Sequence, residues 1–115
     1  MLDDYSRTDF IAAVTDIPNY SVMGYAGFGV DIGGTISTGN LQIQGSSDGK
    51  TWVTIFTADS NGAQPSSNQI TAAGHYTANV IGYNMARIYP SSGFAGSVIA
   101  VATITSMSPQ ITVTI

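Results

Sequence analysis

Short apolar runs with a period of two recur along most of this chain and restrict its fold more than any other feature. Leu41 and Ile43 alternate with Gln42 and Gln44, which places the apolar pair on one face of a strand. Similar runs, separated by Gly, Asn, Pro and Ser clusters, follow at 51–57, 75–81, 85–90, 96–105 and 110–115. We therefore predict an all-β fold, a single antiparallel and jelly-roll-like β-sandwich over residues 20–115. No internal repeat is evident.

The first 19 residues do not follow this pattern. Ser6 followed three residues later by Asp9 is compatible with a short helix start, although Glu or Gln is the usual partner, and an extended arm fits equally well. The segment carries five of the ten charged residues and an apolar cluster at 10–14, and Pro18 separates it from the sheet-forming body. We predict an N-terminal arm or short helix over 1–19 that contacts another protein through Phe10, Ile11 and Val14.

Composition excludes several classes of function. A chain of 115 residues has the size of one domain. Only 9% of its residues are charged and its net charge is -4, so no basic surface is available for nucleic acid. The chain has no Cys, and no run approaches the roughly 18 consecutive apolar residues of a membrane span. We expect synthesis in a cytoplasm, with no membrane and no direct nucleic-acid partner.

The titratable residues predict neither an enzyme nor a metal or cofactor site. His75 is the sole His and the chain contains no Glu, so a catalytic triad would have to combine His75 with one of seven scattered Asp residues. His75 is also opposite in phase to Tyr76, Ala78 and Val80, which places it on the outer face if those three pack inward.

The stretch Gly45–Trp52, GSSDGKTW, contains the only Trp and the only Lys. Asp48 and Gly49 form one of the strongest short hairpin signals, and a calcium loop is disfavoured because the next acid after Asp48 is Asp59. We predict a structural hairpin at Asp48, Gly49 and Trp52. Trp52 is expected to anchor the core or an interface, with a sugar-stacking platform as the alternative. Arg87 is expected to pair with an acid or to lie across a polar face, with an intersubunit contact or a ligand contact as the alternatives.

Four segments together resemble a known class of protein: Leu41–Trp52, Gly74–Val80, Ala86–Ile88 and Ser91–Gly96. They are similar to the small β-sandwich structural proteins of tailed-bacteriophage virions, which often show L-x-(I/F/V)-(Q/E)-G-S-x-D-G-x-T-W and then Gly-x-Tyr-x-x-Asn-Val. The resemblance spans 40–105 and its motifs are structural, whereas residues 1–39 match no motif of the class.

The resemblance implies a non-enzymatic virion protein. Its leading form is a trimeric head decoration, or cement, protein on the capsid surface that stabilises the head by binding the major capsid protein. The predicted contacts at Phe10, Ile11 and Val14 would then face the capsid or a neighbouring subunit. The alternatives are a tail, baseplate or fibre-attachment protein, and a carbohydrate-binding adhesion module. The stacking face of such a module would come from the aromatic residues Tyr5, Tyr20, Tyr25, Trp52, Tyr83 and Tyr89.

Overall fold

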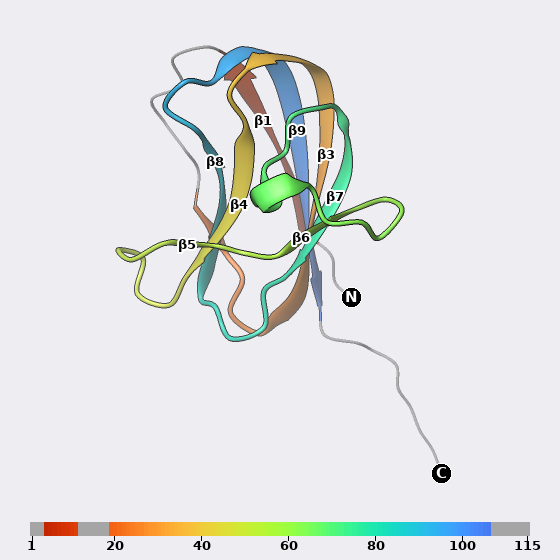
Figure 1. Ribbon diagram of the computed structural model, residues 1–115. Coiled ribbons are helices and arrows are strands. Elements are labelled where there is room, and N and C mark those ends of the chain that lie inside the picture. The colour runs from red at the N-terminus through yellow and green to blue at the C-terminus, as the bar shows by residue number, and fades with distance from the viewer. Residues whose placement is uncertain (1–3, 12–18, 107–115) are drawn as a thin grey trace.

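Two antiparallel β-sheets pack face to face in the computed structural model, which describes residues 4–11 and 19–106 (Figure 1). The strands are β1 (Asp4–Ile11), β2 (Tyr20–Ser21), β3 (Tyr25–Thr38), β4 (Leu41–Ser46), β5 (Val53–Thr54), β6 (Thr57–Asp59), β7 (Gly74–Asn79), β8 (Met85–Pro90) and β9 (Ala95–Ser106). A single 3-10 turn, η1 (Ser66–Asn68), lies between β6 and β7.

The order of the strands identifies the architecture. One sheet has the order β1-β9-β3-β7-β6 and the other has the order β2-β8-β4-β5. With the short β6 set aside, the two four-stranded layers have the arrangement of a jelly roll. The predicted all-β sandwich is confirmed. Within the described residues, no helix is both long and apolar enough to cross a bilayer.

The core lies between the sheets and follows the alternation in the sequence. On β4, Leu41 and Ile43 are fully buried while Gln42 and Gln44 are only half-buried. On β7, Tyr76 and Ala78 point inward and His75 is exposed, as their opposite phase predicted.

The N-terminal segment differs from the prediction. Residues 4–11 form strand β1, which pairs with β9 from Asp4 opposite Ile104 to Ile11 opposite Ser97. These residues are therefore neither a helix nor an arm separate from the sheet. The charged sequence misled the interpretation because charges are also the usual protection of a sheet edge, and β1 is the edge strand.

The apolar run 51–57 does not form one continuous strand. It contributes β5 to the four-stranded sheet and then begins β6 in the five-stranded sheet. Between them, the Ile55 amide donates to the Ile43 carbonyl at 2.8 Å, and the side chains of Ile55 and Thr57 are buried. The run therefore passes from one layer of the sandwich to the other.

Candidate functional site

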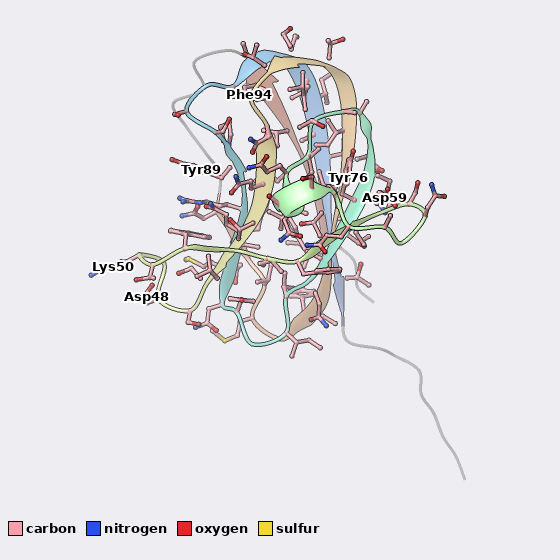
Figure 2. All side chains as sticks on the ribbon, viewed as in Figure 1. Asp48, Lys50, Asp59, Tyr76, Tyr89 and Phe94 are labelled. Atoms are coloured by element: carbon pink, nitrogen blue, oxygen red, sulfur yellow. The ribbon has the colours of Figure 1, made fainter. Side chains whose placement is uncertain are left out.

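The outer face of the four-stranded sheet is built from the polar positions of β4 and β8. Antiparallel pairing places Gln42 opposite Tyr89 and Gln44 opposite Arg87. Since the intervening Ile43 and Ile88 are buried in the core, these four side chains share the outward face. Figure 2 shows Tyr89 on the same side of the molecule as the turn that carries Asp48 and Lys50.

Arg87 is the centre of this face. Its guanidinium carbon lies 4.1 Å from the ring centroid of Trp52 and 4.3 Å from that of Tyr89. Its Nε donates to the side-chain oxygen of Gln44 at 2.8 Å. Burial lowers the pKa of the guanidinium and the nearby Tyr89 opposes that shift, but an arginine remains charged at neutral pH. No carboxylate among the described residues forms an ion pair with it.

A second set of hydrogen bonds fixes the side-chain amide of Gln42. The amide nitrogen of Gln42 donates to Asn40 Oδ1 at 3.2 Å, and Thr54 Oγ1 donates to Gln42 Oε1 at 2.8 Å. The outward side chains of β4 are thus held in defined positions by hydrogen bonds within the protein. We name the surface formed by Trp52, Arg87, Tyr89, Gln42 and Gln44 the arginine face.

Asp48 and Gly49 lie in the connection between β4 and β5, where Gly45 pairs with Val53. Asp48 Oδ1 accepts hydrogen bonds from the Lys50 and Thr51 amides, both at 2.8 Å, and from the Ser46 hydroxyl at 3.1 Å. Gly49 has a φ of 77°, which few other residues adopt without strain. The Asp48 carboxylate therefore stabilises the turn in which it lies. Trp52, at the end of this connection, is half-buried against Arg87 rather than in the core.

The Asp48 turn gives a pH-dependent prediction. Hydrogen bonds from Thr51, Lys50 and then Ser46 hold the pKa of Asp48 below its ordinary value of 3.8. Its stabilisation is therefore fully present above the pKa of the unfolded chain and is lost as the pH falls through the lower pKa of the folded state. We expect Asp48→Ala to lower the free energy of unfolding at about pH 7, with a smaller deficit at about pH 2. Urea denaturation measures both values.

Lys50→Ala is the control for that experiment, because Lys50 is exposed and lies in the same turn. Its substitution should change stability little at either pH. A deficit of Asp48→Ala that is equally large in acid would contradict the assigned role of the carboxylate.

Two matching turns lie together at one end of the sandwich. Val22-Met23-Gly24-Tyr25 joins β2 to β3, and Val80-Ile81-Gly82-Tyr83 joins β7 to β8. In each turn the Tyr amide donates to the Val carbonyl, at 2.9 Å and 3.1 Å respectively, and the Gly has a φ of 85° or 95°. This V-x-G-Y repeat was not recognised from the sequence, because its two short copies are 58 positions apart.

Reciprocal hydrogen bonds hold the two turns side by side. The Val22 amide donates to the Asn84 carbonyl and the Val80 amide donates to the Ala26 carbonyl, both at 2.9 Å. Both valines are fully buried, whereas Met23 is 65% exposed and Ile81 is 54% exposed. We name this end, with its two outward apolar side chains, the twin-turn tip.

Phe10 and Ile11, which the sequence predicts as contact residues, belong neither to the arginine face nor to the twin-turn tip. Phe10 and Ile11 lie in β1, opposite Val98 and Ser97, and Val14 lies outside the described residues. On the other outer face, His75 Nδ1 is 2.6 Å from Asp31 Oδ1 and both side chains are exposed. Within the described part of the chain, no three His, Cys, Asp or Glu side chains come together as metal ligands.

Two shallow hollows lie on the surface that the described residues form. One of about 430 Å³ lies beside Phe56, Thr77 and Thr105, and one of about 230 Å³ lies beside the β4–β5 turn and Tyr83. The first is lined by apolar and neutral polar side chains, and Asp48 in the second already accepts the hydrogen bonds of its own turn. Neither hollow brings together a pair of groups for acid–base chemistry.

Comparison with known proteins supports the fold. No protein-family profile and no curated protein matches this chain. Among solved structures, that of the SPBc2 prophage-derived protein YomS is similar, with a TM-score of 0.67 and 12% sequence identity. The match covers 90% of this chain and 95% of that chain. It shows that nearly the whole sandwich of this protein recurs in another protein of about the same extent.

Proposed function

We propose that this chain is a non-enzymatic structural protein of a tailed-bacteriophage virion, and specifically a head decoration protein that binds the major capsid protein. Two findings support the phage context. The GSSDGKTW hairpin and the segments after it resemble virion sandwiches, and the similar YomS structure is prophage-derived. A fold alone does not define a function, so the argument for a structural role rests on the surface.

The twin-turn tip is the observation that carries this proposal. Its two apolar side chains are exposed, yet their turns are fixed by hydrogen bonds and by buried valines. Exposed apolar groups on a rigid support favour contact with another protein, because burial gains free energy and little conformational entropy is lost. We propose that Met23 and Ile81 insert into the capsid surface.

A trimer would strengthen this contact. Three tips on one closed assembly bind neighbouring capsid subunits together, so each further contact forms at a high effective concentration. The added interface raises the free energy needed to separate the capsid subunits. The proposal therefore describes a mechanical role on the capsid surface, without turnover of a substrate.

The test uses phage heads that lack this protein. Full-length protein should cosediment with such heads, and Met23→Ser combined with Ile81→Ser should weaken binding about 100-fold, because burial of each side chain contributes roughly 1.5 kcal/mol or more. Ile99→Ser is the matched control, since Ile99 is 40% exposed on β9 and outside the tip. Light scattering on each variant checks that the oligomer, expected to be a trimer, is unchanged.

Two results would count against the proposal. Unchanged binding of the double variant would remove the tip from the contact. Binding of the wild-type protein to purified tails and not to heads would instead favour a tail, baseplate or fibre-attachment role.

A further inference from the structure

Arg87 has unused hydrogen-bonding capacity at a defined position. A guanidinium has five N–H groups, and only the Nε–H has an acceptor among the described residues, namely Gln44. The four N–H groups on the two terminal nitrogens have no acceptor within residues 4–11 and 19–106. The ring centroids of Trp52 and Tyr89 both lie within 4.3 Å of the guanidinium carbon, so the two rings contact the guanidinium and its terminal edge is the part left for a ligand.

The surroundings of that edge define the chemistry of the ligand. A planar guanidinium matches a carboxylate, which accepts two parallel hydrogen bonds from it. Trp52 is half-buried and Tyr89 is 36% exposed, so part of each ring is accessible beside the guanidinium, and an aromatic ring suits the flat C–H face of a pyranose. The amide nitrogen of Gln44 has no acceptor among the described residues and can donate to a sugar hydroxyl.

We propose that the arginine face binds acidic saccharides, with the carboxylate of a uronic or sialic acid on the terminal nitrogens of Arg87 and the sugar ring against Trp52 or Tyr89. The ordered amides of Gln42 and Gln44 supply hydrogen bonds to neighbouring hydroxyls. This site is separate from the twin-turn tip and does not depend on the contact with a capsid.

The distribution of charge supports an anionic ligand. The whole chain has a net charge of -4, yet Lys50 and Arg87, the two cations whose side chains the structure describes, are both near Trp52: Lys50 precedes it by two positions in the sequence and Arg87 lies against its ring. No described carboxylate neutralises Arg87, whereas Asp31 is paired with His75 on the other sheet. An acidic protein that holds an arginine beside two aromatic rings, with no described carboxylate paired to it, has a local site for a negative group.

Trp52 makes the test direct, because it is the only tryptophan and its fluorescence reports on this face alone. We expect oligogalacturonate, titrated into the full-length protein, to change the emission of Trp52 in a saturable and salt-sensitive way. Arg87→Gln should weaken binding at least about tenfold, and Arg87→Lys should give an intermediate loss because it keeps the charge but not the planar pair of donors.

A ligand control needs no change in the protein. The same oligosaccharide with its carboxylates reduced to alcohols should bind at least about tenfold more weakly. Thermal unfolding of the Arg87 variants shows whether they remain folded. Poly-L-glutamate that binds as tightly as oligogalacturonate would overturn the proposal in favour of an acidic protein segment. Absence of a response to both oligogalacturonate and oligosialic acid at about 10 mM would overturn it outright.

Discussion

Replacing Gly34 with alanine is expected to lower the free energy of unfolding by about 2–4 kcal/mol. Gly34 lies in β3 with a φ of 104°, where side-chain-bearing residues are strained. A Cβ at this position would also collide with the Ser97 carbonyl oxygen and lie 3.0 Å from Val98 Cα. Both atoms belong to the backbone of β9, so no side-chain rotation relieves the overlap.

Gly33→Ala is the matched control for that experiment. Gly33 is the adjacent residue of the same strand, but a Cβ there would meet no atom within 4 Å and its φ is outside the left-handed region. Alanine at 33 should therefore change stability by less than about 0.5 kcal/mol. Urea denaturation of both variants measures the difference. Equal stability of the two would show that β3 and β9 separate easily at this point.

The sequence contains enough local information to predict the sandwich. Alternation in Leu41–Gln44 predicts which side chains enter the core, and the phase of His75 against Tyr76 predicts that His75 faces outward. The turn at Asp48 and Gly49 is largely local, because the hydrogen bonds to the Asp48 carboxylate and the Ser46 hydroxyl join residues within a few positions, although Asn84 also donates to the Ser47 carbonyl. Features of this kind depend on strand periodicity and turn geometry, which neighbouring residues determine.

The role of residues 4–11 was not predictable in the same way. Whether a charged extended segment is free or forms a sheet edge depends on its partner, and here that partner is β9, some 90 positions later in the chain. Tertiary pairing, not local preference, decides such a segment.

The two candidate surfaces have the same origin in long-range pairing. Gln44 and Arg87 meet only because β4 and β8 pair in one particular register, and a shift of one residue would turn Arg87 toward the core. Likewise, the two V-x-G-Y turns become one surface only when β2, β3, β7 and β8 are assembled. The sequence therefore indicates the individual side chains, whereas the fold determines which of them form a site.

Phe28→Ala is expected to have the largest effect of all, a loss of about 3–5 kcal/mol of unfolding free energy. Phe28 is 0% exposed at the centre of the core, and its ring centroid lies 5.5 Å from that of Tyr20. Its cross-strand neighbour Ala78 is too small to fill the cavity that truncation would leave. Since a domain of this size is stable by only about 5–15 kcal/mol, the variant should melt at a much lower temperature.

Phe56→Ala separates core packing from the loss of an aromatic ring in general. Phe56 is 59% exposed, so the same truncation there should cost less than about 1 kcal/mol. If Phe28→Ala proves too unstable to purify, Phe28→Leu keeps most of the buried volume and should show a smaller loss in the same direction. Chemical denaturation gives the free energy of unfolding of each of the three variants, and the value for Phe56→Ala should be nearest to that of the wild type. A Phe56→Ala variant as unstable as Phe28→Ala would mean that the hollow beside Phe56 is part of the stabilising core, and the two-layer description of packing would have to change.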